Sequence, residues 1–308
     1  MSSTLGVVLV TGASGSIGSH LLRALATAPA GEIRALARSD AAAERIRAAG
    51  AATGALVRII RGDIRDGDAV ADAISGVDTI FHLAAEKDVV RCEACPEEAI
   101  ATNVGGTVAV VSAARQNEHP PFVVAASTAK ASRPVSVLGL TKALMERVVC
   151  ASGHGCAVRL GNVIGSSGSV LDQWRRSAKD QGEILVTDVE MTRFVVTPET
   201  AARMLSEAAR ILHAGAVLVP RQSAYRLGDL AEAFARVGGV RIKEVGPRPG
   251  ETRHEMLVAS DESSQSADGD WIMVDPAGAP AESMSIMSNE APRLTQTELD
   301  QLLRSIWH

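Results

Sequence analysis

Hydrophobic positions in the first half of the chain alternate between two periods. Leu5–Thr11 is an apolar run followed by a glycine, which is typical of a parallel strand buried on both faces. Ile17, Leu21, Leu22 and Leu25 then recur at the spacing of one helix face. The same alternation continues to Leu160, with strands expected at Ile33–Ala37, Leu56–Arg61, Val77–Ala84, Phe122–Ser127 and Ala157–Leu160, an Ala-rich helix after the second strand, and helices at Val70–Ile74, Ala99–Ala114 and Val137–Cys150. This order predicts an α/β fold: a Rossmann, doubly wound parallel sheet with right-handed crossovers.

The pattern loosens after Gly161. We expect helices and short strands to mix there, with helices at Val170–Lys179, Thr200–Leu212, Leu227–Val237 and Thr295–Ile306 and strands at Phe194–Val196 and Val217–Val219. Ser260–Asp270 is so polar that we expect it to be mobile, and Pro276–Pro292 is expected to be irregular. The chain is therefore predicted to comprise a Rossmann domain over residues 1–162 and a smaller mixed lobe over 163–308, with some interleaving.

Composition narrows the function classes. The 308 residues carry a formal net charge of −5 and no run of five like charges, which argues against nucleic-acid or anionic-membrane partners. No stretch of 18 apolar residues occurs, and the N-terminus lacks the basic segment of a signal peptide, so a cytoplasmic protein is expected. Cys92 and Cys95 form an isolated CxxC with no second ligand pair, so we expect free thiols and no metal site.

A glycine-rich turn follows the first strand. The segment TGASGSIG places Gly12, Gly15 and Gly18 between a strand and the start of a helix. The first glycine permits the tight turn, the second lets the backbone approach a pyrophosphate, and the third lets helix and strand pack closely. Free N–H groups at the helix start favour phosphate. We therefore predict a dinucleotide site here, formed by Gly12, Ser14, Gly15, Ser16, Ile17 and Gly18.

The end of the second strand indicates which dinucleotide is bound. Arg38 and Ser39 stand where an acid would hydrogen-bond the ribose of NAD, and an arginine can pair with a 2′-phosphate. NADP is therefore expected rather than NAD, unless Asp40 takes that place and Arg38 is a solvated charge. Residues after the third and fourth strands are expected to contact the cofactor as well: Asp63, Ile64, Leu83, Ala84 and Ala85.

Several motifs together resemble one family. They are GDIRDGDAVADAISGVDTIFHLAAEKDVVRCEACPEEAIATNVGGT, RLGNVIGSSGSV, VTDVEMTRFVVTPETA and EVGPRPGETRHEMLVASDE. They look like the extended short-chain dehydrogenase/reductases, and more narrowly the inverting UDP-N-acetylglucosamine 4,6-dehydratases and related capsule-biosynthesis sugar epimerases. The resemblance runs from about Leu5 to Leu303.

The resemblance implies a reaction on a UDP-sugar. NADP⁺ takes a hydride from sugar carbon four, a base removes the proton at carbon five, an acid assists loss of the carbon-six hydroxyl, and the hydride returns to carbon six. The three family residues that act in the oxidation step correspond to Thr128, Leu138 and Lys142 in this sequence. Ser127 can also hydrogen-bond the ligands. Lys142 would hold the nicotinamide ribose, and Lys130 matches the base.

Two catalytic groups of the family are missing. Leu138 replaces a tyrosine, a position at which relatives tolerate methionine, and Ala129 replaces the aspartate that would act as the acid. General acid catalysis is worth roughly 10²–10⁴-fold, so elimination should be slow unless another group substitutes. Glu86 is one candidate, although a solvated carboxylate is the more ordinary interpretation.

Further residues are implied to bind the cofactor or the nucleotide-sugar. Lys87 matches a family lysine near both ligands, and the remaining candidates for the substrate are Asn162, Arg193, Arg248 and Glu251. For each arginine the alternative is an ordinary salt bridge. Relatives form homo-oligomers, so one is expected here. Two other functions stay open: an epimerase that loses no water, and a non-catalytic protein that binds NADP and a sugar nucleotide.

Overall fold

The computed structural model describes residues 5–27, 31–52, 54, 56–166, 168–248, 250–267, 269–279 and 284–307. Its first half alternates strands and helices as the hydrophobic pattern predicts. The elements are β1 (Val8–Thr11), α1 (Ser16–Thr27), β2 (Ile33–Ala37), α2 (Asp40–Ala51), β3 (Val57–Arg61), α3 (Gly67–Ile74), β4 (Thr79–His82), α4 (Val89–Ala94), α5 (Pro96–Ala99), the π-helical turn η1 (Ile100–Gly105), α6 (Gly106–Arg115), β5 (Phe122–Thr128), the 3₁₀ turn η2 (Ala129–Ala131), α7 (Val137–Cys150) and β6 (Gly155–Leu160).

The second half mixes short strands with helices. Its elements are β7 (Asn162–Val163), α8 (Val170–Gln181), β8 (Glu183–Val186), β9 (Thr192–Val196), α9 (Pro198–Ile211), β10 (Val217–Pro220), β11 (Ala224–Arg226), α10 (Leu227–Gly238), β12 (Arg241–Glu244), β13 (Met256–Val258), β14 (Ser263–Ser266), β15 (Trp271–Asp275), β16 (Ile286–Met287) and α11 (Gln296–Trp307). The predicted helices of this half are all present, with ends displaced by a few residues.

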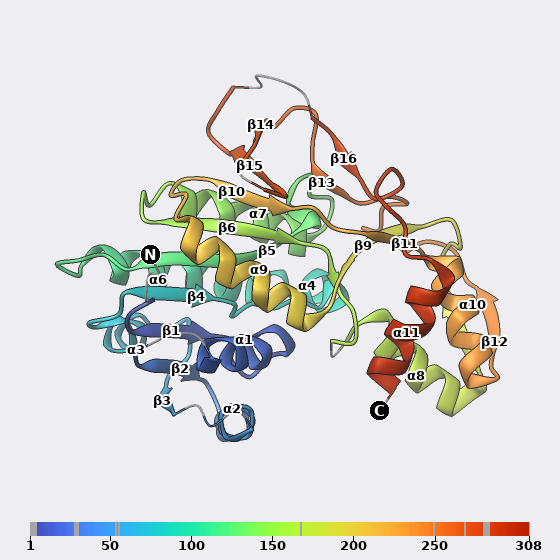
Figure 1. Cartoon of the computed structure of the whole chain (residues 1–308), viewed down its shortest axis with the longest axis horizontal. Helices are drawn as coiled ribbons and strands as arrows, with labels where there is room; N and C mark the ends of the chain where they lie inside the picture. Colours follow the sequence, from blue (N-terminus) through green and yellow to red (C-terminus); the bar gives the residue numbers. More distant parts are fainter. Residues whose placement is uncertain are drawn as a thin grey trace.

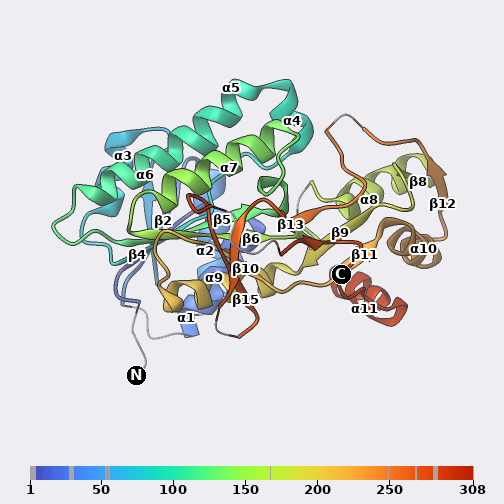
Figure 2. The same ribbon diagram turned by 90° about the horizontal axis from the view of Figure 1, so that it is seen from above.

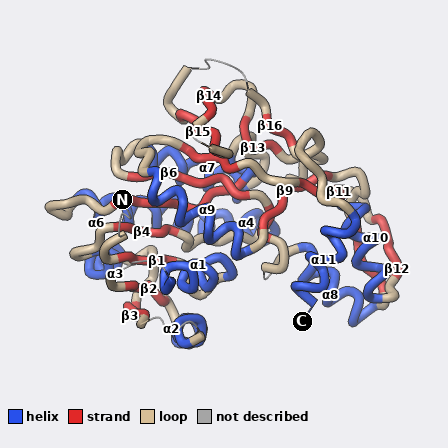
Figure 3. Tube along the Cα trace, in the orientation of Figure 1, coloured by secondary structure: helices blue, strands red, loops and turns tan. Residues whose placement is uncertain are grey.

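Nine strands of the described chain form one sheet in the order β14-β15-β10-β6-β5-β4-β1-β2-β3. The order can be followed in Figure 1, and Figure 3 draws the strands in red. The seven strands from β3 to β10 run parallel, which confirms the doubly wound Rossmann fold. Helices α1, α2 and α9 cover one face, and α3, α6 and α7 cover the other (Figures 1 and 2). Successive β1 residues show why the strand is apolar throughout: Val8 and Val10 enter one core while Leu9 enters the other.

The smaller lobe has a hydrophobic core of its own. Helices α8, α10 and α11 gather with β8 and β12 at one end of the molecule (Figure 1). Trp174 and Phe234 meet edge to face at its centre, with ring centroids 5.5 Å apart. The lobe is joined to the sheet domain through β7, β9 and β11, which form a separate three-stranded sheet.

The predicted mobility of Ser260–Asp270 is wrong for its central part. Ser263–Ser266 forms β14, which pairs with β15 in antiparallel register and closes one edge of the large sheet. The hydrophobic pattern misses such a strand because its side chains lie at an edge, where polar residues are tolerated. Strands β10, β15 and β14 all follow residue 162, so the large sheet draws on both predicted regions, and a boundary at 162 stays a prediction.

Membrane-spanning segments were sought among the described helices. None of them combines the length and the apolar character that a transmembrane crossing requires.

Candidate active site

A cleft of about 1420 Å³ opens at the carboxyl ends of β1, β2, β4, β5 and β6, facing the smaller lobe. Crevices at this edge of an open parallel sheet are where such folds bind ligands. Every residue that the sequence analysis assigned to the cofactor, the substrate or the chemistry lines this one cleft. Residues as distant in sequence as Gly12 and Glu251 are therefore brought to a common surface.

The glycine turn has no room for side chains where a pyrophosphate would approach. Gly12 has a φ of +69°, and a Cβ atom there would lie 2.7 Å from the carbonyl carbon of Leu83. A Cβ on Gly18 would lie 2.5 Å from the Gly12 carbonyl oxygen, and the Gly15 N–H donates to that same oxygen at 3.0 Å. Helix α1 begins at Ser16 and points its free N–H groups into the cleft. The turn thus fits a dinucleotide phosphate group.

The charged side chains that follow β2 and line the cleft are cationic. Arg38 and Ser39 line the cleft together with Arg45 from α2, which the sequence analysis did not single out. Asp40 points away: its side chain is fully exposed and forms an ion pair with Arg61 at 3.2 Å. The alternative in which Asp40 holds the ribose therefore has no support in this geometry.

Asp63 lies beyond β3 at the same end of the cleft. Its carboxylate accepts two hydrogen bonds from the Arg65 guanidinium, at 2.9 and 2.7 Å. These bonds hold the pKa of Asp63 below its ordinary value. The residue remains ionised and can accept further hydrogen bonds from a ligand at its exposed edge.

Helix α7 presents Leu138 and Lys142 one turn apart. The Ser136 hydroxyl caps this helix by accepting from the Gly139 N–H. The Lys142 amine donates to the carbonyl of Ala126 at 2.8 Å, and burial lowers the pKa of Lys142 to about 8. Leu138 packs beside Cys92 and Ala99, so the position that carries tyrosine in the resembled family is filled by an apolar contact.

The two hydroxyls at the end of β5 have different partners. Ser127 is buried and donates to Glu146 at 2.5 Å, which turns its hydroxyl away from any ligand. Thr128 is only partly buried and lines the cleft, where its side chain caps the short turn η2. Thr128 is therefore the better placed of the two to hydrogen-bond a substrate oxygen.

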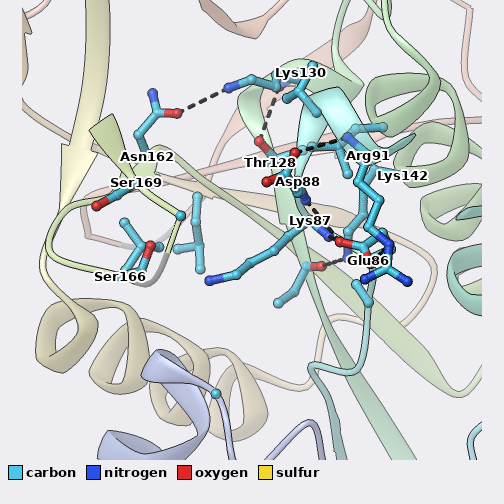
Figure 4. Close-up of a pocket in the computed structure, with 18 of the residues that line it drawn as sticks. Glu86, Lys87, Asp88, Arg91, Thr128, Lys130, Lys142, Asn162, Ser166 and Ser169 are labelled. Carbon is cyan, nitrogen blue, oxygen red and sulfur yellow. Dashed lines mark hydrogen bonds and ion pairs between the residues drawn. The ribbon is translucent and has the colours of Figure 1, made fainter. Parts of the chain in front are cut away.

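Lys130 lies on η2 and is paired with a residue that the sequence analysis missed. Its amine donates to a carboxylate oxygen of Glu255 at 2.6 Å. It also donates to the Asn162 amide oxygen at 3.1 Å, a bond drawn in Figure 4. Glu255 also accepts from the Asn162 amide at 2.7 Å. Burial alone would raise the pKa of Glu255, but the positive charges of Lys130 and Arg193 outweigh it and hold that pKa below its ordinary value. Lys130 is thus ion-paired with a buried carboxylate at the edge of the cleft.

Glu86 and Lys87 are neighbours that point in different directions. The Glu86 carboxylate accepts from the backbone N–H groups of Lys87 and Asp88 and lies 3.3 Å from the Arg91 guanidinium. Lys87 extends across the pocket toward the segment that carries Ser166 (Figure 4). Partial burial lowers the pKa of Lys87, although nearby acids oppose the shift. The position of Glu86 within its own loop weakens the suggestion that it replaces the missing acid.

Three further substrate candidates lie at the lobe side of the cleft. Arg193 donates to the carbonyls of Thr192 and Arg253, which fixes its guanidinium against the floor. Arg248 is exposed at the rim, and its backbone N–H donates to the Glu251 carboxylate at 3.0 Å. The two arginines therefore differ: one is held in place, and the other is available at the mouth of the cleft.

A buried ion network lies directly behind these residues. Arg159 on β6 donates two hydrogen bonds to Glu146, two to Glu262 and one to the Leu257 carbonyl, at 2.6–2.9 Å. Its side chain is 2% exposed. Because Glu262 follows β13, the network fastens the segment that carries Glu255 to the sheet domain.

Comparison with known proteins places this geometry in a family. A family model described as polysaccharide biosynthesis protein matches residues 8–276. The chain is 30% identical over 320 residues to an uncharacterized membrane protein of Methanocaldococcus jannaschii, covering 97% of this chain and 95% of that protein. It is 34% identical over 282 residues to the UDP-glucose 4-epimerase of Rickettsia canadensis, covering 87% and 82%.

Solved structures agree with the sequence relatives. Pen from Bacillus thuringiensis superposes with a TM-score of 0.89 at 29% identity, covering 99% of both chains. The dTDP-glucose 4,6-dehydratase DesIV from Streptomyces venezuelae, solved with NAD and TYD bound, gives 0.70 at 24% identity over 80% of this chain and 86% of that one, a likeness of fold. These findings confirm the resemblance drawn from the motifs: the chain belongs to the polysaccharide biosynthesis protein family.

Proposed function

We propose that this protein is an NADP-dependent enzyme that acts on a UDP-N-acetylhexosamine as a 4,6-dehydratase/5-epimerase with an incomplete catalytic set. The observation that carries the proposal is the convergence of a glycine phosphate turn, Thr128, Lys130 and Lys142 on one cleft. The named relatives include a UDP-glucose 4-epimerase, which supports a nucleotide-sugar as the substrate class.

The residues at the turn fit a dinucleotide. A side chain at Gly12 or Gly18 would clash with backbone atoms, so the turn is kept bare where a phosphate would lie. A bound nicotinamide would supply the oxidation at sugar carbon four and return the hydride later. Arg38 and Arg45 beside Ser39 suit the 2′-phosphate of NADP, because arginine forks match phosphate oxygens and no acid from β2 faces the cleft.

The chain's own groups would then orient the sugar and move protons. Lys142 contributes a buried positive charge and ribose-binding donors, and Thr128 offers a hydroxyl to the sugar oxygen at carbon four. The Lys130 amine is assigned to the proton at carbon five, which the neighbouring ketone makes acidic. The exposed fork of Arg248 and the cation of Lys87 are proposed to hold the diphosphate.

A second candidate function is an epimerase that loses no water. Ala129 is buried among apolar residues, so the position where relatives carry an acid offers no proton to a leaving hydroxyl. Oxidation, proton exchange and reduction need no such acid.

The test is mass spectrometry of UDP-N-acetylglucosamine after incubation with the protein and NADP in heavy water. Dehydration predicts the loss of one water together with deuterium uptake, and epimerisation predicts uptake alone. Binding of both ligands with neither change would contradict both of these functions.

A lysine pair provides the matched variants. Lys130→Ala should lower deuterium uptake by about 10²-fold or more, because it removes the assigned base. Lys179→Ala, which removes an exposed lysine of α8 outside the cleft, is the control and should behave as wild type. Equal uptake by the two variants would remove Lys130 from its role.

A further inference from the structure

The loop that follows β4 forms part of the cleft wall beside the glycine turn. Leu83, Ala84, Ala85 and Glu86 line the cleft, and none of them belongs to a helix or a strand. A Cβ atom on Gly12 would lie 2.7 Å from the backbone nitrogen of Ala84, so the loop and the turn are in direct contact. Any shift of this loop would therefore change the surface that a dinucleotide meets. Because no regular secondary structure fixes the loop, other contacts must hold it.

A threonine at the end of β1 holds the first half of the loop. Thr11 is 1% exposed, and its hydroxyl oxygen accepts from the N–H groups of Leu83 and Ala84, each at 3.2 Å. The hydroxyl also lies 2.9 Å from Nδ1 of His82. Both backbone groups can only donate, so the proton of the hydroxyl is available to Nδ1. Thr11 therefore accepts twice from the loop and donates once to His82.

An asparagine in the π-helical turn η1 holds the other end of the loop. The Asn103 side-chain oxygen accepts from the Glu86 N–H at 2.7 Å, and the side-chain amide donates to the Glu86 carbonyl at 3.0 Å. The same amide donates to the Thr141 hydroxyl on α7 at 3.0 Å. Asn103 is 1% exposed, and π-helical turns are frequently found at functional sites. The loop is thus held at both ends by buried side chains.

His82 connects these two holding points. The Thr107 hydroxyl donates its one proton to the Asn103 carbonyl at 2.6 Å, so it accepts from Nε2 of His82, 3.0 Å away. Nε2 therefore carries the proton and Nδ1 accepts from Thr11, which fixes His82 as one neutral tautomer. Burial, together with the positive charge of Lys142, lowers the pKa of His82 to about 3, so the ring stays neutral near pH 7.

Stability alone gives a weak reason for this hydrogen-bond chain. Replacing both partners of a buried hydrogen bond by apolar groups of the same shape can be nearly neutral. A fully satisfied buried network, by contrast, fixes one arrangement of the groups around it. Thr11, His82 and Thr107 do not line the cleft, yet the chain that they form with Asn103 ends on the backbone of a loop that does.

Resting on the dinucleotide site of the function proposed above, we propose that this hydrogen-bond chain is a positioning device. It holds residues 83–86 in the conformation that binds the dinucleotide, and it acts from outside the cleft. His82 is its central link, because each ring nitrogen is bonded toward one end of the loop. A hydroxyl that does not line the cleft should therefore influence dinucleotide affinity.

The test measures dinucleotide affinity by calorimetry for Thr11→Val, Thr107→Val and the double variant. Each change deletes a hydroxyl and keeps a similar side-chain shape. The dinucleotide is NADP or NAD, whichever wild type binds more tightly. We expect each single variant to bind about 5-fold more weakly, which is the usual effect of one hydrogen bond. Two independent losses of this size would multiply to about 25-fold, whereas members of one device should together lose about 10-fold or less.

Thr79→Val is the matched control. Thr79 lies on the same strand as His82, is 6% exposed, and donates to the Leu5 carbonyl at 3.1 Å, and neither residue of that bond lines the cleft. The variant should lower the thermal midpoint as Thr107→Val does while its affinity stays within about 2-fold of wild type. Thr107→Ser restores the hydroxyl and should recover the affinity. The comparison of Thr107→Val with Thr79→Val decides the question even if Thr11→Val does not fold.

The outcomes separate the positioning role from the function it rests on. Equal losses of affinity for Thr79→Val and Thr107→Val would show that the chain only stabilises the sheet. Losses that multiply in the double variant would show that the two threonines act separately. Single variants that both bind within about 2-fold of wild type would show that the loop needs no such support.

Each of these three results overturns the positioning role and leaves the proposed function intact. A wild-type protein that binds neither NADP nor NAD overturns the proposed function itself.

Discussion

Removal of Arg159 should cost more stability than any surface charge of the molecule. Arg159→Met keeps most of the side-chain volume and deletes the charge. It would leave Glu146 and Glu262, which are 3% and 19% exposed, without their shared cation. It would also free the Leu257 carbonyl, which accepts from the same guanidinium at 2.9 Å.

The magnitude follows from burial. Breaking a buried ion pair by removing one partner costs about 3–5 kcal/mol, because the remaining charge stays desolvated. Two carboxylates share Arg159, but Glu262 is partly exposed and also accepts from the Ser132 hydroxyl, so it can be rehydrated. We therefore expect a loss near the middle of that range, about 4 kcal/mol. For a domain with a typical unfolding free energy of about 5–15 kcal/mol, this is a large fraction.

Urea denaturation followed by circular dichroism measures the loss from the shift of the midpoint at constant slope. Arg203→Met on α9 is the control, since Arg203 is 63% exposed and its ion-pair partner among the described residues is Glu207, one turn along the helix. Such a pair contributes about 0.3–0.5 kcal/mol. If Arg159→Met lowers the unfolding free energy by less than about 1 kcal/mol, the network does not fasten the Glu255 segment to the sheet domain, and the role given to Glu262 is wrong.

Four other outcomes are expected. Arg38→Ala combined with Arg45→Ala should weaken NADP binding at least ~10-fold and leave NAD binding nearly unchanged, as measured by calorimetry. The control is Arg47→Ala, whose exposed side chain pairs with Glu44, and equal losses for both dinucleotides would contradict the 2′-phosphate assignment. Leu138→Tyr places a phenol one turn before Lys142 and should speed hydride transfer by ~10-fold or more, as followed by nicotinamide absorbance. The larger side chain should lower the unfolding free energy by about 1–3 kcal/mol, and no gain in rate would argue against that position facing the nicotinamide. The pKa of Lys142 is about 8 in the folded chain against 10.5 in the unfolded chain, so the unfolded chain binds more protons between these two pH values. The difference in unfolding free energy between wild type and Lys142→Met should therefore rise with pH in that window, and a difference that does not change with pH would place the amine in solvent. Leu140 and Leu144 are exposed on one face of α7, so Leu144→Glu should dissociate the expected homo-oligomer, whereas Val237→Glu on α10 should not. Light scattering measures the mass, and an unchanged mass for Leu144→Glu would exclude this face as the subunit interface.

The fold of the first half was predictable because two local signals coincide there. Apolar runs bounded by glycine mark the strands buried on both faces, and the i, i+3, i+4 spacing of Leu21, Leu22 and Leu25 marks the helix between them. Residues at the carboxyl ends of parallel strands must meet at one edge of the sheet. The cleft residues contributed by β1, β2, β4 and β5 could therefore be named from the sequence.

The rest depended on contacts that no local pattern encodes. Ser263–Ser266 is polar, yet it pairs with β15 at the sheet edge, where the partner strand and not the side chains determines the structure. Glu255 lies 125 residues from Lys130, in a segment without clear periodicity. Its one sequence signal was its position within the motif GETRHEM, in which Glu251 was the acid assigned to the substrate.

The site residues also show how a motif can name a residue without giving its environment. Ser127 and Thr128 are adjacent, but strand alternation sends the Ser127 hydroxyl to Glu146 and leaves Thr128 in the cleft. Lys130 matches the family's base by motif, but the motif does not give its ion pair with Glu255. Position along the strand is local information, whereas the partner of a long side chain is set by the packing of distant segments.

The proposed chemistry is tested most directly by a crystal structure of the protein with NADP and UDP-N-acetylglucosamine bound. We predict the dinucleotide phosphates on the turn from Gly12 to Gly18 and sugar carbon five within about 3.5 Å of the Lys130 amine. A structure in which the sugar lies beyond reach of that amine, or in which the turn holds no dinucleotide, would contradict the proposal.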